Sequence, residues 1–218
     1  VLAAALAVAH TQAQARMRRP WTAAPSRDLG PEPHAVELGE RHPDADLAAA
    51  LGTVVHRALE LLDFEGGSLE TAWEQASALA WQQERASVEP ALAERIEARV
   101  LPLLRHIGGG RLLERLWQQR AQVLARELPF LLPAPGLGPV GAVVGSIDLV
   151  LWDPAAASWV VVDFKTDEVD EANIAARAEH HAAQLGAYQR ALAEAWKLPL
   201  LPRAEVWFLR PDRAVALG

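Results

Sequence analysis

The stretch SWVVVDFKT, residues 158–166, decides the fold of this chain of 218 residues. Its three consecutive valines and Phe164 form the kind of β-branched and aromatic run that builds a buried strand. Asp163 interrupts the run, and Lys165, one of two lysines in the chain beside Lys197, follows two residues later. Side chains on a strand repeat their direction every second residue, so Asp163 and Lys165 are expected to point to the same side.

A second acidic strand precedes this one. Residues 139–153, PVGAVVGSIDLVLWD, predict a strand that contains Asp148 and reaches the strand at 158–166 through a short connection. If the two strands pair as a hairpin, Asp148 and Asp163 can project from one end of the sheet. Two carboxylates about 4 Å apart repel each other by roughly 4 kcal/mol at an effective dielectric near 20. Such a pair needs a proton or a cation between its members.

Oxygen ligands of this type suit Mg²⁺ or Mn²⁺. An ammonium at Lys165 could hold a phosphate oxygen or orient a metal-bound water. Two acids with a lysine two residues beyond the second form a minimal set for metal-assisted phosphodiester hydrolysis. The three residues alone leave an alternative open, in which Asp and Lys are simply solvated on an edge strand.

The chain before this region is expected to be helical. Residues 1–19 predict an Ala-rich helix, and residues 20–45, with five prolines, predict a linker. In residues 46–63 a helix is indicated by an apolar stripe of Leu51, Val55, Ala58 and Leu62, with Asp46 as a candidate N-cap. A capping pattern at Ser68 and Thr71 opens the next helix. Further helices are expected at 90–106 and 110–121, separated by three glycines.

From residue 122 the period changes to that of strands. Strands are predicted at 122–132, 139–153 and 158–166, then a long helix at 172–197 and two short strands at 203–210 and 214–218. This order predicts the α/β class, with a central mixed sheet flanked by helices and an N-terminal helical portion. The domain division is 1–45 for helix and linker, and 46–218 for one domain with a helical part at 46–121 and a sheet core at 122–218.

Composition excludes several chemistries. There is no cysteine, so thiolate metal sites, iron–sulfur clusters and disulfides are ruled out. The formal net charge of −7 suggests that metal ions or a partner domain handle the phosphates of any nucleic-acid substrate. Neither lysine follows a glycine, so a Walker A motif is absent. No apolar run suits a membrane span, and we expect no membrane partner. The missing initiator Met favours a piece of a longer polypeptide.

Five segments in one order resemble known proteins, the PD-(D/E)xK nuclease superfamily. More narrowly, they resemble the C-terminal nuclease domain of RecB/AddA-type (UvrD-like) helicase–nucleases. The five segments are GTVVHRALE at 52–60, RELPF at 126–130, GSIDLV at 145–150, VVDFKT at 161–166 and HAAQLGAYQRAL at 181–192. The resemblance spans residues 52 to about 209 and implies a restriction-endonuclease-like core.

The resemblance implies a role for each matching residue. Asp148 and Asp163 would bind the metal, Lys165 would be the catalytic lysine, and the backbone carbonyl of Phe164 would be a further ligand. His56, in the Gly-x-x-x-His motif that starts at Gly52 on the helix predicted at 46–63, would be a metal ligand too; the alternative is a half-exposed helical histidine.

Three other residues are implied at the rim of the site. Glu127 would lie near the site and contact it directly or through a water molecule. The alternative is an ordinary strand-surface glutamate. Gln184 and Tyr188, four apart on one helix face, would touch DNA, unless they belong to an ordinary amphipathic helix. The adjacent His180 and His181 are expected on the surface.

These implications predict a Mg²⁺- or Mn²⁺-dependent deoxyribonuclease with one or two metal ions and no iron–sulfur cluster. Its substrate would be DNA, most simply a single strand cut in an exonuclease-like manner during double-strand-break repair. An upstream helicase domain or a partner subunit would accompany it in the bacterial cytoplasm, at the nucleoid. Two alternatives remain: a free-standing restriction-type endonuclease and an inactive DNA-binding nuclease fold.

Overall fold

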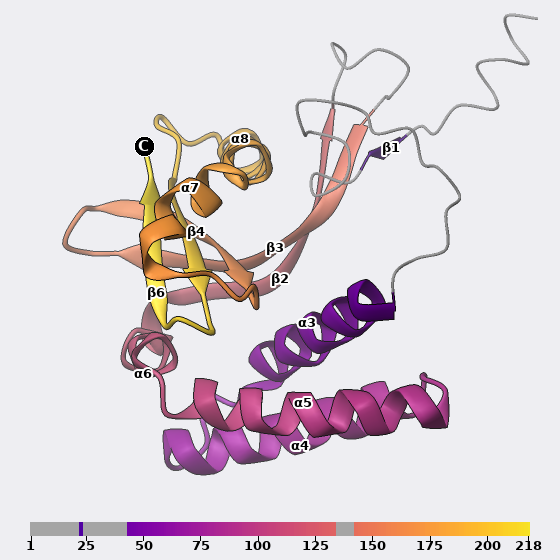
Figure 1. Ribbon diagram of the computed structural model, residues 1–218. Coiled ribbons are helices and arrows are strands. Elements are labelled where there is room, and N and C mark those ends of the chain that lie inside the picture. Colours follow the sequence, from indigo (N-terminus) through magenta and orange to yellow (C-terminus); the bar gives the residue numbers. More distant parts are fainter. Residues whose placement is uncertain (1–21, 24–42, 134–141) are drawn as a thin grey trace, which may run out of the picture.

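The computed structural model describes residues 22–23, 43–133 and 142–218, which form a sheet between two groups of helices (Figure 1). The helix predicted at 1–19 and most of the linker predicted at 20–45 lie outside the described residues. The predicted α/β class, with a mixed central sheet, flanking helices and an N-terminal helical part, is confirmed. The division of the chain after residue 45 stays a prediction.

Within the described residues, six strands form the sheet. They are β1 (Thr22–Ala23), β2 (Val123–Pro133), β3 (Ala142–Asp153), β4 (Ser158–Lys165), β5 (Arg203–Phe208) and β6 (Arg213–Leu217). As predicted, β2, β3 and β4 are antiparallel neighbours. The pair β4 and β5 is parallel, and β5 and β6 are antiparallel. The short β1 pairs with the start of β3, so part of the predicted linker joins the sheet instead.

Strand β4 lies inside the sheet and is buried on both faces. Val160, Val162 and Phe164 pack into the core on the side of the N-terminal helices, and Val161 packs into the core under the C-terminal ones. A strand covered on both faces needs apolar side chains at consecutive positions. This explains why the run at 160–164 is continuous except at Asp163.

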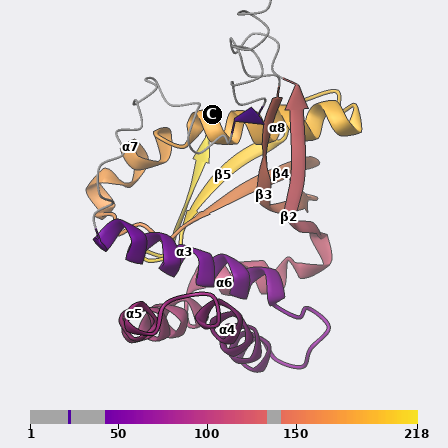
Figure 2. The same cartoon turned by 90° about the vertical axis from the view of Figure 1, so that its right-hand side faces the viewer.

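One face of the sheet is covered by four helices in two layers (Figure 2). They are α3 (Pro43–Leu61), α4 (Leu69–Arg85), α5 (Pro90–Gly108) and α6 (Arg111–Gln118), followed by the 3₁₀ turn η1 (Arg120–Gln122). The predicted cap at the start of α4 is present, because the Thr71 amide donates to the Ser68 hydroxyl. Gly108 allows α5 to end against α4, since a Cβ there would lie 2.6 Å from a ring carbon of Trp73.

Helix α3 begins at Pro43, three residues earlier than predicted. Asp46 therefore lies in the first turn, and its prediction as N-cap is wrong. Proline suits the first turn because its missing N–H would have no partner there. The predicted apolar stripe is confirmed, since all its members are buried: Leu51, Val55, Ala58 and Leu62.

The opposite face carries η2 (Glu171–Asn173), α7 (Ile174–Glu179) and α8 (Ala182–Trp196). The prediction of one continuous helix at 172–197 is wrong, because the chain bends at His180 and His181. Ala178 of α7 and Leu185 of α8 are buried in the same core. The bend lets both pieces lie on one twisted sheet.

Within the described residues, none of the helices combines the length and the apolar character that crossing a membrane requires.

Candidate active site

Three acidic residues lie at one level on three neighbouring strands. In the ladder between β2 and β3, the residue pairs before and after this position are in register. Glu127 of β2 therefore lies opposite Asp148 of β3. In the ladder between β3 and β4, Leu149 pairs with Val162. The next residue on each strand is Asp148 on β3 and Asp163 on β4, so these two acids lie opposite each other. The hairpin predicted from the sequence thus brings these two acids to one place in the sheet.

Asp148 and Asp163 are both buried, with exposed fractions of 6% and 1%. The Phe164 amide donates a hydrogen bond of 2.6 Å to Oδ2 of Asp148. Burial and the negative charge of Asp163 raise the pKa of Asp148 to about 7, although His56 and the Phe164 amide act in the opposite direction. Near neutral pH the pair therefore requires a proton, or a cation in its place.

Asp163 has little compensation from the protein. Lys165 Nζ lies 2.8 Å from its Oδ2, yet no group donates a well-oriented hydrogen bond to either of its oxygens within the described residues. A buried carboxylate without such donors is costly, because it has given up its hydration without replacement. The Asp163 carboxylate, which has one ammonium and no well-oriented hydrogen bond among the described residues, can therefore accept a further positive charge.

His56 reaches the acids from helix α3. Its Nε2 lies 3.1 Å from the Phe164 carbonyl oxygen, and its Nδ1 lies 3.3 Å from Oε1 of Glu127 and 3.8 Å from Oδ1 of Asp148. Burial alone would lower the pKa of His56, but the hydrogen bond to Glu127 and the surrounding carboxylates raise it to about 9. In the metal-free protein the imidazolium offsets part of the negative charge.

Glu127 holds the imidazole rather than lying on the strand surface. Its backbone φ is 47°, in the left-handed region that a glutamate rarely adopts. Such conformations cost on the order of 1–3 kcal/mol and cluster at functional sites. A carboxylate on one ring nitrogen fixes the orientation of a histidine whose other nitrogen serves as a ligand. No sequence signal reveals this φ value.

Arg126, the preceding residue, was not singled out by the sequence. Its guanidinium donates to the carbonyl oxygens of Leu59 and Leu62, at the end of α3, and lies 4.3 Å from the centroid of the Phe64 ring. It thereby ties the helix that carries His56 to the strand that carries Glu127. The only sequence signal was an arginine inside the RELPF segment.

Lys165 has a second contact, on helix α8. Its ammonium donates to Oε1 of Gln184 at 3.3 Å, and the Gln184 amide donates to the Tyr188 hydroxyl at 2.6 Å. Tyr188 is buried against Phe130, and burial raises the pKa of Tyr188, so the hydroxyl stays protonated. The structure therefore places Gln184 and Tyr188 beside the lysine. Their contact with DNA stays a prediction.

The remaining sequence-predicted residues lie at the rim. A Cβ on Gly52 would sit 3.6 Å from the Thr166 hydroxyl, so helix and strand approach closely there. His180 is exposed as expected. His181 is half-buried rather than exposed, since its ring packs near Phe208 and its Nε2 is buried without a hydrogen-bond partner among the described residues.

The donors converge well enough to hold a divalent ion. One ligand atom from each of His56, Glu127 and Asp148 lies within 4.8 Å of the others, and Asp163 adds oxygens that no donor satisfies. Carboxylates, a carbonyl and one imidazole suit Mg²⁺ or Mn²⁺. An open hollow of about 610 Å³ gives access to His56 and Glu127 between α3 and β2. The roles of these residues in metal binding and catalysis stay predictions.

Comparison with known proteins gives a family match over most of the chain. The family model described as "PD-(D/E)XK nuclease superfamily" matches residues 29–216. A solved structure described as "Crystal structure of SSO0001" is 16% identical, covers 80% of this chain and 73% of its own, and has a TM-score of 0.37. That likeness is too weak to inform the fold or the function. No curated protein matches the chain significantly.

Proposed function

The chain belongs to the PD-(D/E)XK nuclease superfamily, whose nucleases use divalent metals, and we propose that it is a Mg²⁺- or Mn²⁺-dependent deoxyribonuclease. We propose further that it hydrolyses single-stranded DNA in an exonuclease-like manner. The observation that carries the proposal is the convergence of a buried carboxylate that accepts no well-oriented hydrogen bond among the described residues, Asp163, with Asp148, His56 and Lys165. A carboxylate with a purely structural role would instead have hydrogen-bond donors within the protein.

Each side chain has a distinct task in this proposal. His56, Asp148, Asp163 and the Phe164 carbonyl would hold the metal, and Glu127 would orient His56. When bound, the divalent ion supplies a Lewis acid for the phosphate and lowers the pKa of a water.

Lys165 is not counted among the ligands. Its ammonium provides a fixed positive charge where negative charge develops on the phosphate. Gln184 and Tyr188 hold the ammonium in position from α8.

We also propose that the domain works beside a helicase, as a domain or a partner subunit, in repair of double-strand breaks in the bacterial cytoplasm. What supports this is the order of the five segments that resemble RecB/AddA-type nucleases, from GTVVHRALE at 52–60 to HAAQLGAYQRAL at 181–192. A motor would supply the single strand that the nuclease cuts.

Cleavage assays on end-labelled DNA test the activity. Linear single strands should be degraded with Mg²⁺ or Mn²⁺ and left intact in EDTA, and circular single strands should resist. Cutting of circular duplex DNA would favour a restriction-type endonuclease instead. If no substrate is cut with either metal, the inactive DNA-binding fold is the better description.

A further inference from the structure

A cleft opens immediately beyond Lys165, on the side of Thr166. We call it the Thr166 cleft; it has a volume of about 710 Å³ and lies between the start of α3, helix α5, residues 166–170, α7 and Arg210. Gly52, whose position is in contact range of Thr166, also lines the hollow over His56 and Glu127. The cleft thus begins where the active site ends.

The cleft continues into a second hollow. This smaller space, of about 400 Å³, lies between α5 and the turn at Pro211. The two hollows share four lining residues, Arg99, Glu168, Val169 and Arg210. Together they form a track along the seam between the helical part and the sheet, with Arg99 and Arg210 at the junction. A track next to a phosphodiesterase site suits the continuation of a polymeric substrate.

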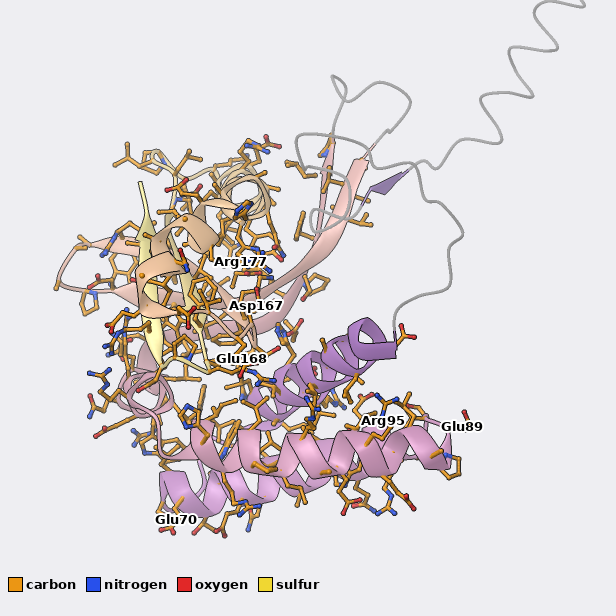
Figure 3. All side chains as sticks on the ribbon, viewed as in Figure 1. Glu70, Glu89, Arg95, Asp167, Glu168 and Arg177 are labelled. Atoms are coloured by element: carbon orange, nitrogen blue, oxygen red, sulfur yellow. The ribbon has the colours of Figure 1, made fainter. Side chains whose placement is uncertain are left out.

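The three arginines of the Thr166 cleft differ in how far their charge is compensated. Arg177 is engaged by Asp167, with nitrogen–oxygen distances of 2.7 and 2.8 Å, so it mainly ties α7 to the segment after β4. Figure 3 shows these two residues with Glu168 beside the sheet, facing the layer of α3 and α5. Arg177 is therefore a poor candidate for binding an external anion.

Arg210 and Arg99 keep most of their charge available. The firm contact of Arg210 is to a neutral group, the Thr166 carbonyl, at 2.7 Å. Its acidic neighbour Glu168 is 4.0 Å away with a side chain that is 92% exposed, which makes a weak pair. Arg99 is exposed and has no ion pair or hydrogen bond with the residues that the structure describes. Asp170, also in the lining, opposes them.

The facing wall comes from helix α3. Ala48 is exposed in this lining, whereas Leu47 and Leu51, which also line the cleft, belong to the buried core. A DNA single strand carries phosphates along its backbone, which arginine side chains in a groove can contact. The volume is within the range of pockets that bury a small ligand.

We propose that the Thr166 cleft binds the nucleotides of a DNA single strand adjacent to the scissile phosphate, with Arg99 and Arg210 contacting phosphates. The proposal rests on the proposed nuclease function and adds the direction in which the strand leaves the site. It assigns Arg99, on a helix far from the acidic strands in sequence, to the binding of substrate.

Binding in EDTA tests the cleft without relying on cleavage. A fluorescein-labelled oligothymidylate is titrated with wild type, Arg99→Glu and Arg105→Glu. Arg105 is the matched control, because it is exposed on the same helix and lines neither hollow. Loss of one charge-assisted phosphate contact should weaken binding about tenfold in Arg99→Glu, whereas Arg105→Glu should bind as wild type does.

Salt dependence distinguishes a phosphate contact from a change in fold. Arg99→Ala should reduce the slope of log Kd against log salt by about 0.7, the value for one phosphate contact on a single strand. The KM for oligonucleotide cleavage should rise in the same variant. Equal affinity and slope in Arg99→Ala and wild type would overturn the proposal, as would an equal loss in Arg105→Glu.

Two further outcomes separate the rival explanations. If polyglutamate displaces the oligothymidylate as well as unlabelled DNA does, the cleft recognises an acidic protein partner and the proposal fails. Absence of metal-dependent cleavage by wild type, together with an Arg99-dependent affinity in EDTA, would refute the proposed nuclease function but leave the cleft as a DNA site.

Discussion

Two buried carboxylates on neighbouring strands differ in how well the protein compensates their negative charge. Glu205 of β5 is 5% exposed, and both its oxygens are satisfied. Arg115 of α6 donates to them at 2.9 and 3.2 Å, and the Trp207 indole donates at 2.8 Å while its ring lies under the same guanidinium. This carboxylate fastens α6 to the sheet.

Asp163 of β4, in contrast, is more deeply buried and has fewer hydrogen-bond donors and cations around it. It has one ammonium nearby and no well-oriented hydrogen bond among the described residues, and a second carboxylate, Asp148, adjoins it. A carboxylate that stabilises a fold has its partners built into the protein. The difference indicates that Asp163 is kept for a partner from outside the chain, which we take to be a divalent metal.

Replacing Asp163 should have the largest effect. Asp163→Asn removes the charge of a proposed metal ligand and is expected to reduce DNA cleavage by about 10³ or more, several kcal/mol of transition-state stabilisation. Gel assays with Mg²⁺ and Mn²⁺ measure this. The matched change at the other carboxylate, Glu205→Gln, should leave cleavage unchanged; an equal loss there would erase the distinction between the two acids.

Lys165 should come next. Lys165→Ala is expected to slow cleavage by roughly 10²–10³, the scale for losing one preorganised charge at a developing oxyanion. Mn²⁺ affinity should not fall, since the ammonium is not a ligand. Lys165→Arg should not restore full activity, because a planar guanidinium cannot replace a compact ammonium in a tight site. Wild-type rates in Lys165→Ala would mean that Lys165 is only a solvated lysine.

Removing the arginine partner of the satisfied carboxylate, Glu205, should lower the stability of the fold rather than the rate of cleavage. Arg115→Ala leaves the buried Glu205 with the Trp207 indole and with Arg203 at 3.9 Å, and we expect a loss of about 2–3 kcal/mol in the free energy of unfolding. This is below the roughly 3–5 kcal/mol of a fully buried pair, because the Arg115 side chain is 35% exposed. Urea denaturation measures the change. A loss under about 1 kcal/mol would show that the pair behaves like a surface ion pair.

The smallest effect is expected at His56. His56→Ala removes one proposed ligand but leaves the carboxylates, so Mn²⁺ affinity should fall about 10- to 100-fold, no less than the loss of a group that only orients a metal ligand. Isothermal titration calorimetry gives the affinity and the stoichiometry. If neither changes, His56 is a helical histidine that happens to lie near the acids.

Much of the fold and of the candidate site is predictable from the regular periodicity of side chains in strands and helices. The period of two places Asp163 and Lys165 on one side of β4, and the observed 2.8 Å contact agrees with that expectation. The short connection after Asp153 predicts a hairpin, which brings Asp148 next to Asp163. The apolar stripe of α3 predicts which of its faces is buried. These features depend on neighbours in sequence, so local patterns reveal them.

The rest depends on contacts between distant residues. The φ value of Glu127 and its hold on His56, 71 positions away, leave no local pattern. The bend at His180 and His181 has neither glycine nor proline and follows from packing on the sheet. Gln184 is predicted to contact DNA, and the structure places it beside Lys165. Helix periodicity alone does not say how closely α8 packs against β4, so the sequence does not reveal this contact.

The central claim is that the charge of Asp163 is only partly compensated until a divalent metal binds. The most direct measurement is the melting temperature of wild type and Asp163→Asn, each in EDTA and in Mn²⁺. In EDTA the variant should be at least as stable as wild type, because repulsion with Asp148 is relieved and Lys165 keeps its contact with Gln184. Mn²⁺ should raise the melting temperature of wild type and have little effect on the variant. A clear loss of stability by the variant in EDTA, or equal stabilisation of both proteins by Mn²⁺, would contradict the account.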